Sequence, residues 1–152
     1  MKKDILFVIK IANKKDTNGC IKLSEDSWPE WWAKNETLGK KHIRECVKGK
    51  RCLIATANKE IVGFFVWGNL WNKIHIQDIF VKENYRKAGI ATKFLEKATR
   101  IAEKQGFKEV ISDCDISNKK SISFHMKNGF KKSGLIKKHW DNEDSYVFSK
   151  KI

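Results

Sequence analysis

The amino-acid sequence predicts a mixed α/β protein (α+β in its element order) that forms one domain over residues 1–152. Three observations lead to this prediction. Segments with the two-residue period of strands alternate along the chain with segments of helical period. A chain of 152 residues, with 41% hydrophobic and 33% charged residues, can form one sizeable core and has a globular composition. The chain also has a single proline, no internal repeat and no segment with the composition of a linker.

The first half of the chain predicts three strands and a helical region. In order, we expect a strand at residues 5–11, a polar turn at 13–18, one or two helices within 27–50, and an antiparallel hairpin of runs 52–57 and 61–67. Pro29 suits a first helical turn, and apolar residues recur at helical spacing from Ile43. The hairpin follows from two apolar runs that flank Asn58, Lys59 and Glu60.

The second half of the chain predicts alternating strands and helices. In order, we expect a turn at residues 69–73, a strand at 74–81, a helix from 90, a strand at 110–115, a short helix at 121–128, and a strand pair from 130. The longer helix follows from apolar residues that recur at i, i+3, i+4 and i+7. Gly106 stops the longer helix, as a left-handed cap does, and Gly129 ends the short helix.

The chain is strongly basic, with 32 Lys+Arg against 18 Asp+Glu and a formal net charge of +14. Such a charge favours anionic partners, which are nucleotides, other phosphates or nucleic acid. The excess is spread along the chain, except that residues 116–140 contain seven lysines and no acidic residue. We interpret these lysines as a solvated surface and keep a nucleic-acid face as the alternative.

The sequence predicts a cytoplasmic protein without a membrane segment. No apolar run approaches the roughly eighteen residues that a membrane span needs. The lysines and short apolar run of residues 1–11 are interpreted as a first strand, because the long apolar region and cleavage site of a signal peptide are missing. The cysteines have neither CxxC nor zinc spacing, so we expect free thiols rather than a disulfide at Cys20, Cys46, Cys52 and Cys114.

Residues 85–91, Tyr-Arg-Lys-Ala-Gly-Ile-Ala, place two cations and a glycine directly before a helix. The first amide groups of a helix lack partners within it, and the helix dipole adds positive potential there, so such a turn binds phosphate well. The segment lacks the Gly-Lys-Ser/Thr ending of a P-loop and the GxGxxG pattern of dinucleotide-binding folds. It therefore predicts a phosphate site of another kind.

Three segments in a fixed order carry a family resemblance. Residues 86–91 read Arg-x-x-Gly-x-Ala, residues 77–81 (Gln-Asp-Ile-Phe-Val) form an apolar strand end five positions before Arg86, and residues 118–130 read Asn-x-x-Ser-Ile-x-Phe-His-x-Lys-x-Gly-Phe. Together these segments resemble the GNAT superfamily of acetyl-CoA-dependent N-acetyltransferases. The resemblance covers residues 52–135 by motif and the ends of the chain by element order. Among subfamilies it is similar to the aminoglycoside 6′-N-acetyltransferases and the polyamine acetyltransferases.

The resemblance implies a fold and a set of cofactor contacts. The implied fold has a mixed, mostly antiparallel sheet of about six to seven strands flanked by about four helices, with strands four and five splayed around acetyl-CoA. Acetyl-CoA is implied as the acyl donor, and no metal is implied. The implied contacts are the turn amides for the pyrophosphate, the fourth strand for the pantetheine and acetyl carbonyl, and one asparagine: Arg86, Lys87, Ala88, Gly89, Ile90, Ala91, Ile79, Phe80, Val81 and Asn118.

The resemblance also implies direct transfer, in which an amine attacks the thioester in a ternary complex. His125 occupies the position where the family usually has a tyrosine that protonates the leaving thiolate, and imidazole can donate a proton at neutral pH. The alternative is a histidine that only packs or bonds the cofactor. Asp78 and Asp113 are the main candidates for the base, followed by Asp115 and His75, and either aspartate could instead bind a cationic substrate. Cys114 is not expected to be a nucleophile, because neighbouring aspartates disfavour a thiolate.

The sequence leaves the amine acceptor open. Trp28, Trp31 and Trp32, with Trp67 and Trp71, could line an aromatic pocket, although core packing is the commoner role for such residues. The charge of +14 disfavours a polycation such as an aminoglycoside, which leaves a small amine, a protein amino terminus or an aminoacyl-tRNA. The alternative function is a non-catalytic module that senses acetyl-CoA or binds RNA. We expect a monomer or a homodimer.

Overall fold

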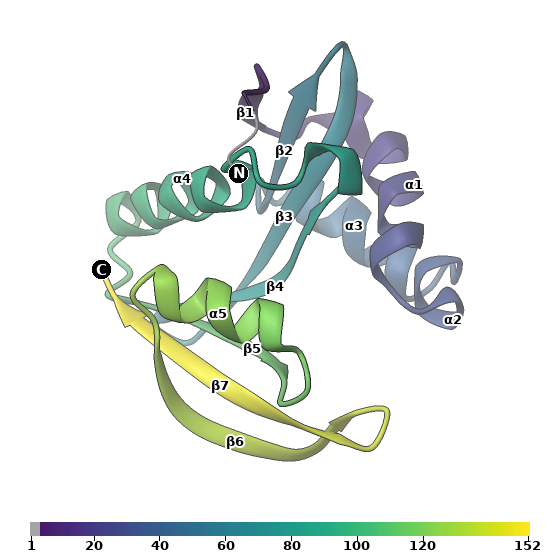
Figure 1. Cartoon of the computed structure of the whole chain (residues 1–152). Coiled ribbons are helices and arrows are strands. Elements are labelled where there is room, and N and C mark those ends of the chain that lie inside the picture. Colours follow the sequence, from purple (N-terminus) through teal and green to yellow (C-terminus); the bar gives the residue numbers. More distant parts are fainter. Residues whose placement is uncertain (1–3) are drawn as a thin grey trace. The chain divides into compact units, whose positions relative to one another are not determined.

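The structure, a computed structural model, describes residues 4–152, and the chain forms two compact units (Figure 1). The first unit comprises residues 4–68 and Asp78–Ala98, and the second comprises Asn69–Gln77 and Thr99–Ile152. The chain passes from one unit to the other within strands β3 (Glu60–Leu70) and β4 (Lys73–Val81) and within helix α4 (Ile90–Lys104). The single domain expected from the sequence stays a prediction.

Across residues 4–152, seven strands are hydrogen-bonded in the order β1-β2-β3-β4-β5-β7-β6, together with five α-helices. The remaining strands are β1 (Val8–Ile11), β2 (Cys52–Ala57), β5 (Glu109–Asp115), β6 (Lys131–Trp140) and β7 (Glu143–Lys151). β4 and β5 are parallel, whereas β1 with β2, β2 with β3, β5 with β7 and β6 with β7 are antiparallel. The α/β class with a mixed, mostly antiparallel sheet is therefore confirmed.

In the first unit, helices cover both faces of the β2–β3 hairpin (Figure 1). The helices α1 (Thr17–Ser27) and α3 (Gly39–Lys48) pack on one face, with the short α2 (Glu30–Ala33) between them in the chain. The buried residues there are Cys20, Leu23, Ile43, Cys46, Val47, Cys52, Ile54, Phe64 and Val66. On the other face, Phe94 of α4 packs against Phe65 with ring centroids 6.0 Å apart. The tight turn of the predicted hairpin has left-handed φ angles of 50° and 64° at Asn58 and Lys59.

The sequence prediction was wrong about α1. Residues 13–18 were expected to form a turn, but Asn13 instead begins a short 3-10 helix that leads directly into α1. The Asn13 side chain accepts a hydrogen bond from the Lys15 amide, and Asp16 accepts one from the Asn13 amide, so these polar residues cap a helix start. The first strand is also shorter than expected, since β1 begins at Val8 rather than at residue 5.

In the second unit, β4 pairs with β5 from Lys73 and Glu109 to His75 and Ile111, while β7 lies between β5 and β6. Helix α5 (Lys119–Lys127) lies beside β5 (Figure 1) and begins two residues earlier than predicted. Gly106 has a φ angle of 86° after α4, which confirms the predicted left-handed cap, and Gly129, which was predicted to end the short helix, has a φ angle of 83° after α5. Every residue of β6 except His139 is exposed, and β6 is an end strand of the hydrogen-bonded order.

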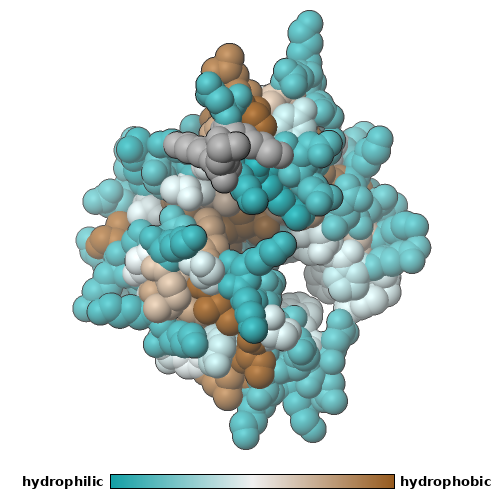
Figure 2. Space-filling model, in the orientation of Figure 1, coloured by the Kyte–Doolittle hydropathy of each residue, from teal (hydrophilic) through white to brown (hydrophobic). Residues whose placement is uncertain are grey.

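Hydrophilic side chains dominate the face of the molecule in Figure 2, in keeping with its 32 Lys+Arg and 18 Asp+Glu residues. All four cysteines are free, as expected, and all four are buried. Within residues 4–152, every helix is too short or too polar to cross a lipid bilayer.

Candidate active site

In the first unit, the turn between β4 and α4 has the features of an anion site. Gly89 has a φ of 87°, and a Cβ atom built on it would meet no other atom within 4 Å. Lys87 also has a left-handed φ of 65°, and both Arg86 and Lys87 are exposed. The first helical hydrogen bond runs from the Lys93 amide to the Gly89 carbonyl, so the amides before Lys93 have no partner four residues back in the helix. The turn thus offers backbone donors and positive charge beside an open space.

Phe80 and Val81, at the end of β4, contact both Arg86 of this turn and Gly63 of β3. Arg86 Nε donates a hydrogen bond of 2.9 Å to the Val81 carbonyl, and the guanidinium lies 5.9 Å from the centre of the Phe80 ring. A Cβ atom on Gly63 of β3 would lie 2.8 Å from the Phe80 carbonyl oxygen. Glycine at residue 63 therefore lets β3 approach β4 closely. Gly63 was not predicted to matter for the site, although a glycine inside an apolar strand is a signal for a close approach.

Asp78, on β4 in the first unit, contacts the last residue of α1. Its Oδ2 accepts a hydrogen bond of 2.6 Å from the Ser27 hydroxyl. Burial raises the pKa of the Asp78 carboxyl, although hydrogen bonds from Ser27, Trp28 and the Ile79 amide act in the opposite direction. A carboxylate with a raised pKa accepts a proton more readily at neutral pH, as a general base must.

An aromatic cluster stands next to Asp78. The Trp28 ring lies 6.4 Å from Trp32, 5.9 Å from His42 and 5.9 Å from Phe64, measured between centroids. Trp28 and Trp32 are partly exposed, as an aromatic wall of a binding site requires. Trp67, in contrast, is 2% exposed and belongs to the core.

Asp113 lies on β5 in the second unit, between two histidines. His75 Nε2 is 2.8 Å from its Oδ1, and His139 Nε2 is 3.3 Å from its Oδ2. Burial acts to raise the pKa of Asp113, but the hydrogen bond and charge of His75, the charge of His139 and a hydrogen bond from Trp140 leave it below the usual range. The structure thus adds His139 and Trp140, which were not among the predicted site residues.

His125, on α5 in the second unit, is 3% exposed and stacks on the Phe148 ring at 4.5 Å. Its Nδ1 lies 2.7 Å from the Ser121 carbonyl oxygen, and its Nε2 lies 2.8 Å from the Ser112 hydroxyl. Because a carbonyl only accepts, Nδ1 carries the hydrogen and Nε2 accepts from Ser112. Burial lowers the pKa of His125. These contacts favour a neutral, packing imidazole over a proton donor.

The other predicted residues of the second unit have local partners. The Asn118 side chain accepts a hydrogen bond from the Ser121 amide and so caps α5. Asp115 accepts a hydrogen bond of 3.2 Å from the Ser145 hydroxyl. Burial raises the pKa of the Cys114 thiol, which disfavours the thiolate needed by a nucleophile. Within residues 4–152, no group of three or more His, Cys, Asp or Glu side chains could hold a metal ion.

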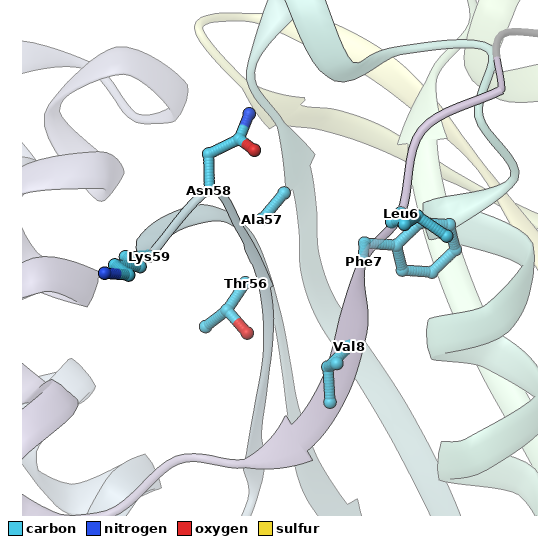
Figure 3. Close-up of a pocket in the computed structure, with 7 residues that line it drawn as sticks. All are labelled: Leu6, Phe7, Val8, Thr56, Ala57, Asn58 and Lys59. Atoms are coloured by element: carbon cyan, nitrogen blue, oxygen red, sulfur yellow. The ribbon is translucent and has the colours of Figure 1, made fainter.

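A pocket of about 380 Å³ lies elsewhere in the first unit (Figure 3). It is lined by the start of the chain and the β2–β3 turn: Leu6, Phe7, Val8, Thr56, Ala57, Asn58 and Lys59. None of the predicted site residues contributes to it. Leu6 is 93% exposed, so this pocket is an open surface depression.

The turn before α4 and the order of elements define a class of protein. The acetyltransferase (GNAT) family model matches residues 18–130, and the chain belongs to this family. It is therefore an N-acetyltransferase, an enzyme of a family that takes its acetyl group from acetyl-CoA.

Three relatives with assigned activities align with most of the chain. The N-alpha-acetyltransferases of Sulfolobus acidocaldarius and Saccharolobus solfataricus are both 26% identical, over 97% and 96% of this chain and 94% and 93% of theirs. The spermidine N(1)-acetyltransferase of Thermoplasma acidophilum is 25% identical over 81% of this chain and 87% of its own.

Solved structures show the same fold. The crystal structure of Ard1 from Thermoplasma volcanium aligns with a TM-score of 0.83 at 19% identity, covering 96% of this chain and 97% of that one. The ribosomal-protein-S18-alanine N-acetyltransferase of Escherichia coli aligns with a TM-score of 0.80 at 17% identity, covering 97% and 94%.

Proposed function

We propose that this enzyme transfers the acetyl group of acetyl-CoA to the α-amino group at the amino terminus of a protein. The observation that carries the proposal is the end-to-end similarity to archaeal N-alpha-acetyltransferases, which spans 97% of this chain and 94% of the Sulfolobus acidocaldarius relative. The net charge of +14 supports it, because long-range repulsion disfavours a polycationic acceptor such as spermidine. An α-amino group is also easier to deprotonate than a lysine, with a pKa of about 7.7–8.0.

The turn at residues 86–91 is proposed to bind the pyrophosphate of acetyl-CoA. This proposal is supported by the open space at Gly89, by the backbone amides before Lys93 that have no partner four residues back in the helix, and by the exposed charges of Arg86 and Lys87. The main chain of residues 79–81 is proposed to bond the pantetheine and the acetyl carbonyl, and Asn118 to contact the cofactor.

The proposed chemistry is a direct transfer. The amine nitrogen attacks the thioester carbonyl carbon, a C–N bond forms, the C–S bond breaks, and the thiolate leaves with the bonding electrons. Asp78 is the better carboxylate for receiving a proton, because its pKa is raised, and Asp113 is the better one for attracting a cation, because its pKa is lowered. His125 is proposed to support the site by packing, while the thiolate takes a proton from the amine or from water.

A spermidine acceptor is the second candidate. It is favoured by the Thermoplasma acidophilum relative and by Asp113, whose lowered pKa favours a carboxylate that could attract a cationic amine. We place the enzyme in the cytoplasm, because its four thiols are free and buried.

The decisive experiment is a mass-spectrometric screen of acceptors with acetyl-CoA. The panel contains peptides with free amino termini, the same peptides with blocked termini and an internal lysine, and spermidine. We expect acetylation of the free α-amino group and little reaction with the blocked peptides. Acetylation of spermidine alone would reject the protein-terminus proposal in favour of the second candidate.

A further inference from the structure

One end of the sheet in the second unit carries a group of lysines from two strands. The strand register pairs Lys131 and Lys132 of β6 with residues 149 and 148 of β7, so that the start of β6 lies beside the end of β7 (Figure 1). Lys151 and Lys150 lie two residues further along β7, which makes them diagonal neighbours of Lys131 and Lys132 at about 7–8 Å. Because paired side chains share a face of the sheet, one such pair of lysines lies on each face. We call this group the basic end: Lys131, Lys132, Lys150 and Lys151.

The charge of the basic end is not neutralised by ion pairs. Three of its four residues are exposed, and Lys150 is partly exposed. The one acid among the paired strand residues here, all of them in the described part of the chain, is Glu109, whose ion pair is with a lysine of β4. Lys132 and Lys150 lie over the rings of Tyr146 and Phe130, contacts that leave the charge in place. Neighbouring like charges on paired strands destabilise a sheet, so an anionic partner explains this group better than the stability of the fold does.

An exposed aromatic side chain lies at the same end of the sheet. Trp71 is in the turn before β4, which starts at Lys73. Lys73 is paired with Glu109 of β5, and Glu109 is paired with Lys151 of β7, so the register places this turn in line with the basic end. Trp71 is 88% exposed and has a left-handed φ of 52°, which is an outlier for a bulky residue. Such backbone strain is found mainly where a side chain serves binding or catalysis.

We propose that the basic end and Trp71 bind a single strand of nucleic acid, with the lysines on its phosphates and the indole stacked on a base. Proteins that bind single strands without reading their sequence combine these two elements, a positive surface for the backbone and aromatic rings for the bases. Carboxylates alone would match the lysines and leave Trp71 without a role. The inference goes beyond the proposed acetyl transfer and does not depend on it.

The opposite end of the β6–β7 hairpin has a different character. Lys137 and Lys138 of β6 stand beside the turn to β7, where residues 141–144 include three acids. The Lys138 amide donates a hydrogen bond of 3.0 Å to the Asp144 carboxylate. The seven lysines of residues 116–140 therefore do not form one face. The register separates the two lysine pairs of β6 and joins the first pair to two lysines of β7.

The first test measures binding without acetyl-CoA or an amine. Fluorescein-labelled oligouridine of about 15 nucleotides is titrated with the protein at several salt concentrations, and anisotropy gives the Kd. With four lysines on phosphates, log Kd should rise with log salt at a slope of about 3, from roughly 0.7 per contact. Oligothymidine of the same length shows whether RNA alone or either nucleic acid is bound, since only RNA has the 2′-hydroxyl. Absence of binding to both strands at about 50 mM salt would overturn the proposal.

A matched pair of double variants locates the contact. Lys150→Gln with Lys151→Gln should lower the salt slope by about 1.4 and weaken binding by about 10- to 100-fold at low salt. Lys137→Gln with Lys138→Gln removes the same charge from the opposite end of β6 and should leave the slope unchanged. An equal loss in the two proteins would overturn the proposal, because binding would then follow net charge rather than the basic end.

Variants of Trp71 test the stacking contact. Trp71→Ala should weaken binding by about 5- to 150-fold without changing the salt slope, which is the effect of losing one stacked base. Trp71→Phe keeps an aromatic ring and should restore part of the loss. Unchanged binding in Trp71→Ala would refute the stacking contact. Stronger competition from phosphatidylserine vesicles or polyglutamate than from unlabelled oligouridine would reject nucleic acid in favour of a membrane surface or an acidic protein.

Discussion

Asp78 in the first unit and Asp113 in the second carry the same side chain, but their surroundings move the pKa in opposite directions. Around Asp78, burial outweighs the hydrogen bonds from Ser27 and Trp28, and the pKa rises. Around Asp113, the imidazoles of His75 and His139 outweigh burial, and the pKa falls. The difference shows that the balance of burial and partners, rather than residue type, decides which carboxylate holds a proton. Enzymes commonly divide acid and base tasks in this way.

The largest effect on stability is expected at His125. Burial there disfavours the protonated, cationic form of the side chain, whereas at the two aspartates it disfavours the anionic form. His125→Ala should lower the free energy of unfolding by about 3 kcal/mol, because it removes a buried ring and leaves the Ser112 hydroxyl unpaired. Because burial lowers the native pKa of His125, wild-type stability should also fall as the pH drops below the unfolded value of about 6.5. Urea unfolding against pH measures both effects, and a stable His125→Ala protein with normal folding but no turnover would restore the proton-donor role.

A new carboxylate at residue 89 should have the next largest effect, which is on the stabilisation of the protein by acetyl-CoA. Gly89→Glu places a negative charge where the pyrophosphate is proposed to bind, so acetyl-CoA should no longer stabilise the protein. In the wild type, ligand at about 100 times its Kd should add about 2.7 kcal/mol. Gly89→Gln is the control, because it has the same size and the same strain at a φ of 87° without the charge. The three proteins are compared by thermal unfolding with and without acetyl-CoA. If acetyl-CoA raised the Tm of Gly89→Glu as much as that of the wild type, the turn would not be part of the acetyl-CoA site.

Asp113→Asn should cost about 2 kcal/mol of stability at neutral pH, because it weakens hydrogen bonds to a charged group. A lowered native pKa contributes stability above the unfolded value of about 3.9, and this contribution disappears as the pH falls through the native pKa. The gap between wild type and variant should therefore close in acid. Urea unfolding at a series of pH values tests this, and a gap that widens in acid would contradict the assigned shift.

The same change at Asp78 should have the smallest effect and the opposite pH dependence. A raised native pKa contributes stability that is fully present below the unfolded value of about 3.9 and is lost as the pH rises through the native pKa. The asparagine of Asp78→Asn does not ionise, so the stability of the variant relative to the wild type should increase as the pH rises. We expect the two proteins to differ by about 1 kcal/mol or less at neutral pH. If the stability difference from the wild type changed with pH in the same direction for the Asp78 and Asp113 variants, the opposite pKa shifts of the two carboxylates would be contradicted.

Local signals in the sequence predicted most of the fold. Gly106 and Gly129 stand where helices end, and their left-handed φ angles of 86° and 83° are conformations that glycine adopts freely. The apolar stripe of α4 is buried at Ile90, Phe94 and Leu95, as its spacing predicts. α1 was missed because Asn13 and Asp16 are turn formers and helix caps alike, so that composition alone does not distinguish the two roles.

The candidate site was predicted by its motif residues but not by their partners. Ser27 and Asp78 are 51 positions apart, and His75 and Asp113 are 38 positions apart. A single sequence contains no signal that joins residues at such separations, so the opposite pKa shifts of the two aspartates could not be foreseen. The same holds for His139, which reaches Asp113 only because β6 pairs with β7 and β7 pairs with β5.

The exposed β6 strand has a consequence for how copies of the protein meet. An end strand leaves one row of backbone donors and acceptors open to a matching strand of another molecule, which is the first step of sheet-to-sheet aggregation. β6 carries Lys131, Lys132, Lys137 and Lys138, and none of the ion pairs formed by residues 4–152 neutralises them. Two such strands would bring like charges together along their length. Added salt screens this repulsion, since the Debye length falls from about 10 Å at 0.1 M to about 3 Å at 1 M. Colloidal stability at this edge is therefore electrostatic and depends on the ionic strength of the solution.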